Sequence, residues 1–354
     1  MVFKIAKPAH ARSSLWCAGL RIPLLQGLHY KYFPPGPDCV KMVTDVKTKE
    51  RVKINTKNIG SRGVIFTLGD ANDDLGEIAI YLIKGENRVY LCDTHLGPKS
   101  MEVVKEYLRE NNLGEKQLVV FLTHSDWDHI WGACAFPDAL IIGHDLCRKG
   151  ILDRGKVELQ RYADHQSGEI VLIPPQLTFS EQLRFLDDEV EFYYAPGHTA
   201  DSAVCYDRKD AVLFVGDLVE DPKPMIGYHD LETYIDTLES LAAHPAKTII
   251  SSHSGIVNRK TISENIKYIR MFASKATADL PDKEKNDPAS KLYIMLLYED
   301  AIQQTLGDAF DYQSFQRELW GSLDLNYLDT TSKRLKSISY DELKSALESY
   351  LVQY

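Results

Sequence analysis

The sequence predicts a layered α/β fold with an extension at each end. Short apolar runs rich in β-branched and aromatic residues recur between positions 64 and 250, and amphipathic segments with helical spacing lie between them. Strands that interleave with helices are typical of sheets covered by helices, in an α/β or a layered α+β arrangement. Hydrophobic residues make up 44% of the 354 residues, which is enough for a full core.

The expected strands are short apolar runs that end in small or turn-forming residues. In chain order they are Val64–Leu68, Ile78–Ile83, Val89–Cys92, Leu118–Leu122, Leu140–Ile142, Val190–Tyr194, Ala203–Tyr206, Val212–Val215 and Thr248–Ile250. The expected helices repeat apolar residues every three or four positions, and the last begins with a capping box, Ser339 with Glu342. These helices are Lys99–Glu110, Leu231–Ala243, Ile262–Lys275, Lys291–Gln304 and Tyr340–Leu351.

Two changes of pattern divide the chain into three parts. Residues 1–62 have little periodicity and hold twelve basic against three acidic residues, a net charge of +9, which indicates a basic N-terminal arm with a strand or two. Residues 63–257 contain the strands named above and are predicted to form the main domain, which also holds the ligand motifs described below. Residues 258–354 have a helical pattern and are predicted to form a C-terminal extension, long enough for a lid or a dimer surface.

Composition and charge argue against several classes of protein: nucleic-acid-binding, membrane-spanning, secreted and disulfide-rich proteins. The net charge of −10 opposes nucleic-acid binding, which needs a basic face. No run reaches the roughly 18 apolar residues that a membrane span requires, and the N-terminus does not have the pattern of a signal peptide. The six cysteines have the spacing of neither a disulfide framework nor a zinc knuckle. We therefore expect a cytoplasmic protein with reduced thiols that binds neither nucleic acid nor a membrane.

The densest group of potential metal ligands directly follows one of the expected strands. Residues 122–132 read Leu-Thr-His-Ser-Asp-Trp-Asp-His-Ile-Trp-Gly, so two imidazoles and two carboxylates fall within six positions. Nitrogen and oxygen ligands at this density suit a divalent metal ion, and no sulfur ligand is nearby. A structural role is the alternative, because Asp and Ser also cap helices. The candidate ligands are His124, Asp126, Asp128 and His129.

Three more expected strands end in the same way. His198 lies in the turn Ala-Pro-Gly-His-Thr, Asp217 follows a glycine, and His253 lies between two serines. Each of these residues comes just after a buried apolar run. A single case is typical of a capped turn, but four strand ends that each present a ligand favour a metal site.

In these motifs the chain, over residues 63–257, resembles the metallo-β-lactamase superfamily. The family motif His-x-His-x-Asp-His matches residues 124–129, except that Asp126 stands where the second histidine is usual. The run Cys-Asp-Thr-His-Leu-Gly at 92–97 is similar to the first motif of the family, whose aspartate, here Asp93, supports the ligands from behind. The resemblance implies an αβ/βα sandwich with the site at one edge of two facing sheets.

The resemblance also implies a site for two divalent metal ions. Two cations a few Å apart lower the pKa of a bridging water from about 15.7 toward 7, which makes hydroxide available near neutral pH. Asp128 is the candidate to orient this hydroxide and to move its proton. The implied ligands form two triads joined by one carboxylate: His124, Asp126 and His198; Asp128, His129 and His253; and the bridging Asp217.

Asp126 leaves the identity and the number of the metal ions open. Zinc is the first expectation for the metal. A carboxylate adds negative charge and favours harder ions, so iron and manganese are the alternatives. The flavodiiron branch of the superfamily resembles this pattern, with glutamate at the corresponding place, but no flavodoxin-like stretch follows residue 257. Competence channel proteins have a similar His-x-Asp-x-Asp-His domain but are membrane proteins. In a third interpretation Asp126 is not a ligand and the protein holds one metal ion.

Other residues near the motifs have a structural and a functional interpretation. Trp127 and Trp131, four residues apart, are expected to pack in the core or at its rim rather than to line a pocket. His95 and His144 are expected to cap or support elements rather than to bind metal, because the ligand set is already complete. A loop that borders the substrate in this family contains three candidates for contact with an anionic group: Lys223, Tyr228 and His229.

The function predicted first is a metal-dependent hydrolase, in which a metal-bridging hydroxide attacks a small ester, lactone, thioester or phosphoester. A β-lactam substrate is disfavoured because such enzymes are secreted and shorter, and RNA processing is disfavoured because no basic insert is visible. One alternative is a non-haem iron oxidoreductase, of dioxygenase or diiron type, on the same fold. Another is a metal-stabilised binding module without catalysis. The expected partner is a small-molecule substrate, and the C-terminal helices could form a homo-oligomer.

Overall fold

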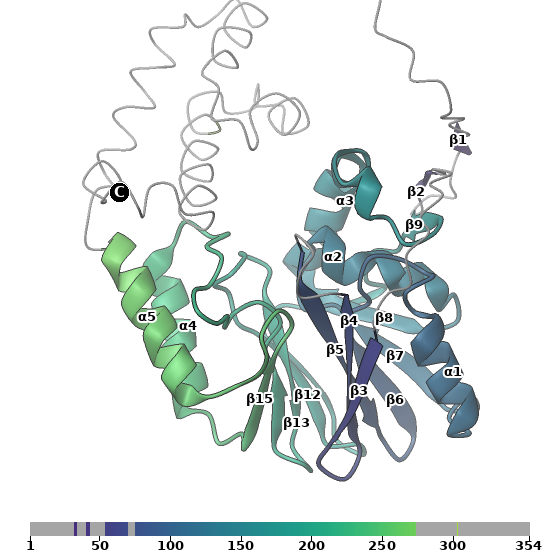
Figure 1. Ribbon diagram of the computed structural model, residues 1–354, viewed down its shortest axis with the longest axis horizontal. Helices are drawn as coiled ribbons and strands as arrows, with labels where there is room; N and C mark the ends of the chain where they lie inside the picture. The colour runs from purple at the N-terminus through teal and green to yellow at the C-terminus, as the bar shows by residue number, and fades with distance from the viewer. Residues whose placement is uncertain (1–31, 34–39, 43–53, 70–74, 274–302, 304–354) are drawn as a thin grey trace, which may run out of the picture.

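Two β-sheets face each other at the centre of the computed structural model, and helices cover their outer faces (Figure 1). The structure describes residues 32–33, 40–42, 54–69, 75–273 and 303. The first sheet contains β3 (Ile54–Ile59), β4 (Gly63–Gly69), β5 (Glu77–Lys84), β6 (Arg88–Cys92), β7 (Gln117–Phe121), β8 (Leu140–His144) and β10 (Leu177–Phe179). The second contains β11 (Gln182–Phe185), β12 (Val190–Tyr194), β13 (Ala203–Asp207), β14 (Val212–Phe214), β15 (Thr248–Ser251) and β16 (Gly255–Val257).

The remaining described elements are a small sheet and the helices. The small sheet pairs β1 (Tyr32–Phe33), β2 (Val40–Met42) and β9 (Ile170–Leu172). The helices are α1 (Glu102–Glu110), α2 (Trp127–Ile130), α3 (Asp145–Arg161), α4 (Leu231–Ala243) and α5 (Arg259–Ala273), with 3₁₀ turns at Trp131–Ala135 and Ala163–His165. Helices α1, α2 and α3 lie on the side of the first sheet, and α4 and α5 lie on the side of the second (Figure 1).

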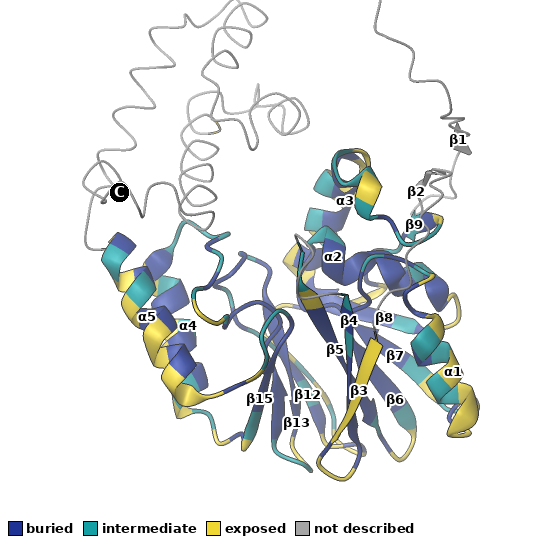
Figure 2. Cartoon of the chain, viewed as in Figure 1, coloured by how far each residue is buried: buried dark blue, intermediate teal, exposed yellow. Residues whose placement is uncertain are grey.

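Buried apolar side chains form one layer between the sheets and one layer under each group of helices. In Figure 2 the central strands of both sheets are coloured mostly as buried. Between the sheets, Phe121 of β7 stacks on Phe192 of β12 with ring centroids 4.3 Å apart. Trp131 is fully buried in the layer outside the first sheet, and Tyr234 of α4 is fully buried in the layer outside the second. Because the central strands are covered on both faces, their sequences are continuously apolar rather than alternating.

Strand directions and backbone hydrogen bonds define one end of this sandwich. In the second sheet β12, β14 and β15 run in the same direction, and in the first sheet β6 and β7 are parallel. At this end the N–H of Ala203, in β13, donates to the carbonyl of Thr123 just past β7 at 2.8 Å, and the N–H of Ala79, in β5, donates to the carbonyl of Ser252 just past β15 at 2.7 Å. Both bonds join one sheet to the other, so they hold the facing strand ends close together. We call this the ligand end.

The opposite end, here called the hairpin end, consists of the turns at 60–62, 85–87, 186–189 and 208–211. The buried guanidinium of Arg62, from the first sheet, forms a 2.6 Å ion pair with Asp207 of the second. Its Nη1 also donates to the carbonyl of Asp188 at 2.7 Å. The Oδ atoms of Asp188 in turn accept bonds from two backbone N–H groups and from the hydroxyl of Tyr90. A polar network with protein partners therefore joins the two sheets here.

The predicted αβ/βα layering is confirmed, and the expected strands and helices within the described residues occur within three residues of their expected bounds. Strand β12 and helix α4 have the expected bounds. The expected helices Lys291–Gln304 and Tyr340–Leu351, and with them the C-terminal dimer surface, lie outside the described residues except for Gln303. Among the described helices, none combines the length and the apolar content that a membrane crossing requires.

Several described elements are not among the strands and helices expected from the sequence: the short strands β9, β10, β11 and β16, the helix α3, and the long edge strand β3, where only a strand or two within residues 1–62 was expected. Helix α3 contains Gly150 and Gly155, whose low helix propensity hides the pattern. Strand β3 buries only the last of its six residues, so it has no apolar run, yet it pairs with β4 along its whole length. The first sheet therefore begins at Ile54, before residue 63 where the main domain was expected to start.

Candidate metal centre

Strand ends bring candidate ligands from the two sheets together. In the first sheet β7 leads to His124, and in the second β12, β14 and β15 lead to His198, Asp217 and His253. All four side chains lie at the ligand end, where the cross-sheet backbone bonds hold the loops. Side chains that are up to 129 positions apart in the sequence can therefore face one another.

The short helix α2 supplies the other candidate ligands. Its N-cap residue, Asp126, has an extended backbone with φ −69° and ψ 144°, and the chain turns into the helix after it. Asp128 and His129 are adjacent and buried within α2. Successive residues of an α-helix point about 100° apart, so the three side chains reach different parts of the site from a few residues of chain.

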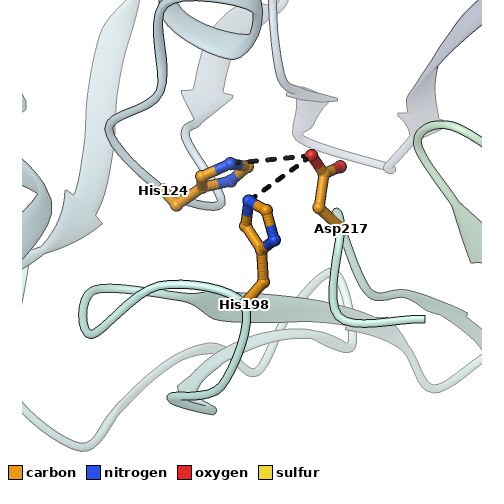
Figure 3. A group of neighbouring side chains, drawn as sticks. All are labelled: His124, His198 and Asp217. Carbon is orange, nitrogen blue, oxygen red and sulfur yellow. Dashed lines mark ion pairs between the residues drawn. The ribbon is translucent and has the colours of Figure 1, made fainter. Parts of the chain in front are cut away.

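The first cluster consists of His124, His198 and Asp217 (Figure 3). Oδ2 of Asp217 lies 3.8 Å from Nε2 of each imidazole. Asp126 also faces these imidazoles, because its Oδ2 lies 3.6 Å from Nε2 of His124 and 3.4 Å from Nε2 of His198. Ligand atoms about 2.0–2.1 Å from a tetrahedral metal ion lie roughly 3.3 Å from one another, so these separations are close to those of a binding site.

The second cluster consists of Asp128, His129 and His253. Oδ2 of Asp128 lies 3.5 Å from Nε2 of His129 and 3.3 Å from Nε2 of His253. Oδ2 of Asp217 lies 3.1 Å and 3.2 Å from the same two nitrogens. One oxygen of Asp217 is therefore close to imidazoles of both clusters.

Buried atoms without partners test whether this arrangement fits metal ions. Nε2 of His124 and Oδ1 of Asp217 are buried and have no hydrogen-bond partner. An unsatisfied buried polar atom costs about 1–3 kcal/mol, so such atoms are rare unless a ligand satisfies them. The donor atoms are imidazole nitrogens and carboxylate oxygens, which zinc, iron and manganese accept. The residues present therefore fit divalent metal ions.

Asp93 supports one imidazole of each cluster from behind. Its Oδ2 lies 2.9 Å from Nδ1 of His129 and accepts a 2.8 Å hydrogen bond from the hydroxyl of Thr123. The Thr123 oxygen in turn lies 2.9 Å from Nδ1 of His124 and can accept from its N–H. With a metal ion bound, both imidazoles would then carry a proton on Nδ1 and present the lone pair of Nε2 to the ion. Thr123 was not expected in this role, although a hydroxyl residue directly before His124 is a possible signal.

The carboxylates determine the charge of the histidines in the metal-free protein. Burial lowers the pKa of His198, but Asp126 and Asp217 outweigh it and raise this pKa to about 9. In the same way, neighbouring carboxylates outweigh burial and hold the pKa values of His129 and His253 well above their usual value. The imidazoles of His129, His198 and His253 are therefore protonated and paired with carboxylates near neutral pH. A metal ion must displace these protons to bind.

The sequence comparison decides the family. The family model described as the metallo-beta-lactamase superfamily matches residues 73–253, just over half of the chain. The chain belongs to the metallo-β-lactamase superfamily. The family predicted from the motifs is thus confirmed, and the matched segment contains both clusters. The superfamily includes metal-dependent hydrolases such as the β-lactamases, which supports a metallo-hydrolase in general terms.

Solved metallo-β-lactamases share the fold of this chain. DIM-1, in a structure of the enzyme exposed to ceftazidime, is 15% identical, with a TM-score of 0.52 over 63% of this chain and 99% of that one. FIM-1 from Pseudomonas aeruginosa, in its mono-zinc form, is 16% identical, with a TM-score of 0.51 over 62% of this chain and 95% of that one. At these identities the similarity shows the fold alone. No curated protein sequence matches the chain.

The two tryptophans in and after the metallo-β-lactamase motif, Trp127 and Trp131, pack in the core or at its rim, as expected from the sequence. Trp131 is fully buried, and Trp127 stacks on Tyr162 with ring centroids 4.4 Å apart. His144 caps α3, because its Nδ1 accepts from the N–H of Leu146 at 3.2 Å. These side chains belong to the scaffold rather than to the ligand set.

His95 and the three loop candidates of this metallo-β-lactamase domain lie outside the two ligand clusters. His95 is buried beyond β6, and burial lowers its pKa to about 3, so it is neutral. The Lys223 ammonium lies 5.1 Å from the centroid of the Tyr268 ring of α5. The rings of Tyr228 and His229 are half-buried and pack with centroids 5.1 Å apart. Contact of Lys223, Tyr228 or His229 with a substrate stays a prediction.

Proposed function

We propose that this protein is a dinuclear-metal hydrolase that cleaves a small ester, lactone, thioester or phosphoester. The observation that carries the proposal is the position of Asp217, whose Oδ2 lies between 3.1 and 3.8 Å from Nε2 atoms of both clusters. A carboxylate oxygen between two such clusters suits two cations a few Å apart. Membership of a superfamily that includes metal-dependent hydrolases supports the reaction class.

The side chains divide the work of such a site. When bound, two divalent metal ions supply a water whose pKa is near 7 rather than about 15.7, and they polarise the oxygen of the bond to be cleaved. We assign Asp128 to orient this water and to receive its proton, because its Oδ2 faces the second cluster, 3.5 Å from Nε2 of His129 and 3.3 Å from Nε2 of His253. The assigned ligands are His124, Asp126 and His198 for one ion, Asp128, His129 and His253 for the other, and Asp217 for both.

Zinc is the metal that we propose first. Imidazole and carboxylate donors are usual for zinc, and a solved structure with the same fold, FIM-1, was obtained in a mono-zinc form. The carboxylate of Asp126, which faces Nε2 of His124 and His198 at 3.6 and 3.4 Å, makes iron or manganese the next candidates.

Elemental analysis and a substrate panel test the proposal. The full chain is purified without added metal, analysed for metal content, and then assayed with added zinc, manganese or iron on esters, lactones, thioesters and phosphoesters. We expect about two divalent ions per chain and hydrolysis of at least one substrate class. Asp128→Asn should lower kcat/KM by about 10²–10⁴-fold, as expected when a group that transfers a proton is lost. The exposed Asp138→Asn is the matched control and should change neither quantity.

The same experiment distinguishes the hydrolase from the alternative function that the carboxylate of Asp126 favours, a non-haem iron oxidoreductase. Two iron atoms per chain, with spectra that change on reduction and no hydrolysis in the panel, would replace the hydrolase by a non-haem iron oxidoreductase. Bound metal without any turnover would instead favour a metal-stabilised binding module.

A further inference from the structure

Helix α3 passes beside α2 and places a guanidinium against one of the proposed ligands. Nη2 of Arg154 lies 3.3 Å from Oδ1 of Asp126, and it also donates to the hydroxyl of Ser125. The other oxygen of Asp126, Oδ2, faces the Nε2 atoms of His124 and His198. The two oxygens of this carboxylate therefore have different partners, a guanidinium on one side and the imidazoles of the first cluster on the other.

Local packing holds Arg154 in this position. Gly150 precedes it by one turn on the same face of α3, where a Cβ atom would lie 2.9 Å from Cβ of Ser125 and 3.3 Å from Nη2 of Arg154. A glycine therefore leaves the space that the serine and the guanidinium occupy. On the other side of the guanidinium, Oε1 of the buried Glu158 lies 3.7 Å from Nε of Arg154. Burial raises the pKa of Glu158 to about 7, so at lower pH this carboxyl is largely neutral and leaves the guanidinium charge to Asp126.

A charge count shows what the contact can do. Two divalent cations, one hydroxide and the carboxylates of Asp128 and Asp217 together carry one positive charge. A neutral imidazole at position 126 would leave this net charge at one positive, whereas the carboxylate of Asp126 lowers it to zero. The guanidinium of Arg154 returns it to one positive charge. A hydrogen bond from a guanidinium also draws electron density from the carboxylate, which makes Asp126 a weaker donor, closer to an imidazole.

We propose that Arg154 is the positioning residue that allows a carboxylate to act as ligand at position 126, because it fixes Asp126 as a one-oxygen ligand and offsets its charge. The inference rests on the proposed metal site. The metal position that Asp126 ligates therefore depends on Arg154, a residue of α3. This dependence must disappear when position 126 carries an imidazole.

A double-mutant cycle tests this dependence without an activity assay. The variants are Arg154→Met, Asp126→His and the double variant, all in the full chain. After chelator treatment, zinc affinity is measured by competition with a chromophoric chelator, and the visible spectrum of bound cobalt(II) reports the coordination. Arg154→Met should weaken one of the two zinc positions by about 10–100-fold, the usual effect of losing a residue that orients a ligand. In the Asp126→His background the same change should leave zinc affinity unchanged or increase it.

Matched variants separate this effect from a loss of structure. Lys149→Met removes a positive charge from the same helix, but this side chain is 71% exposed and pairs with Asp153, so zinc affinity should not change. Arg154→Lys keeps the charge and loses the planar fork, so it should fall between Arg154→Met and the unmodified chain. Circular dichroism and thermal unfolding check the fold of each variant. If Asp126→His does not fold, Asp126→Asn removes the same charge and closes the cycle.

The outcomes decide between the two proposals. Equal zinc losses in both backgrounds, or no loss on Arg154→Met, would overturn the role of Arg154. A chain that binds neither zinc nor cobalt would overturn the metal site and the role of Arg154 together. A chain that shows the expected coupling but hydrolyses nothing in the panel would overturn the hydrolase alone.

Discussion

The hairpin end and the ligand end of the sandwich both bury charged side chains, but they satisfy them differently. At the hairpin end the carboxylate of Asp207 pairs with Arg62 at 2.6 Å, and both groups belong to the protein. At the ligand end Nε2 of His124 and Oδ1 of Asp217 are buried without a partner. Because buried polar atoms are nearly always hydrogen-bonded, the first pattern is typical of a structural link and the second of a binding site.

The carboxylates at the two ends show the same difference. The carboxylate of Asp188 at the hairpin end accepts four hydrogen bonds from groups of the protein: two from backbone N–H groups, one from the hydroxyl of Tyr90 and one from Arg88. At the ligand end, carboxylates and imidazoles are crowded so closely that the pKa values of His129, His198 and His253 rise and those of Asp126 and Asp217 fall. The four predictions below test this contrast, beginning with the largest expected effect.

Asp217→Asn should remove metal binding at the ligand end. The substitution removes the one carboxylate close to imidazoles of both clusters, so metal affinity should fall by more than about 100-fold, beyond the effect of losing a residue that only orients a ligand. Hydrolysis should be lost with it. Isothermal titration with zinc measures the affinity, and Asp138→Asn is the exposed control. Two metal ions bound with unchanged affinity would show that Asp217 is not a shared ligand.

Arg62→Met should damage the fold and spare the site. It leaves Asp207 buried without its partner, which costs about 3–5 kcal/mol of unfolding free energy. Urea denaturation measures this loss. Lys209→Met breaks a 3.4 Å pair with Glu86 between exposed side chains and should cost at most about 1 kcal/mol. Zinc affinity should stay the same in both variants. A large loss of zinc affinity in Arg62→Met would mean that the two ends are not independent.

Asp93→Asn should weaken both clusters without removing a ligand. The carboxylate accepts from the backbone N–H of Thr123 at Oδ1, and from His129 and the Thr123 hydroxyl at Oδ2. The amide has one acceptor oxygen and cannot accept all three bonds, so zinc affinity should fall by about 10–100-fold. Thr123→Val is the matched variant, because it removes the support of His124 alone and should affect one zinc position. Equal effects of Thr123→Val on both positions would contradict this division.

The pH dependence of stability should differ between the metal-free and the metal-loaded protein. The pKa of His198 is about 9 in the metal-free fold, against 6.5 for an ordinary histidine, so the folded state binds more protons than the unfolded chain between these values. The unfolding free energy of chelator-treated protein should therefore fall as pH rises from 6.5 to about 9, while zinc affinity increases over the same range. Urea denaturation at several pH values measures the first trend. An unfolding free energy of the metal-free protein that stays constant between pH 6.5 and about 9 would show that His198 is not held protonated by its neighbouring carboxylates.

The sequence predicted those parts of the site that depend on neighbouring residues. A strand that ends in a turn exposes the next polar side chain at the sheet edge, so His124 and His253 could be recognised from a few residues of local pattern. The same local signal failed for α3, because Gly150 and Gly155 interrupt it, and for β3, because a strand at the edge of the sheet needs no apolar run.

By itself, the sequence determined the family, the layered fold and the candidate metal ligands with Asp93 behind them, because strand patterns and ligand motifs are properties of short segments. Only the tertiary structure decided which other side chains contact these residues and which join the two sheets. Thr123 stands between Asp93 and His124, Arg154 contacts Asp126 from a helix 28 positions later in the chain, and Arg62 pairs with Asp207 across 145 positions. A hydrogen bond or an ion pair depends on distances of a few Å, and folding alone sets these distances between residues far apart in the chain.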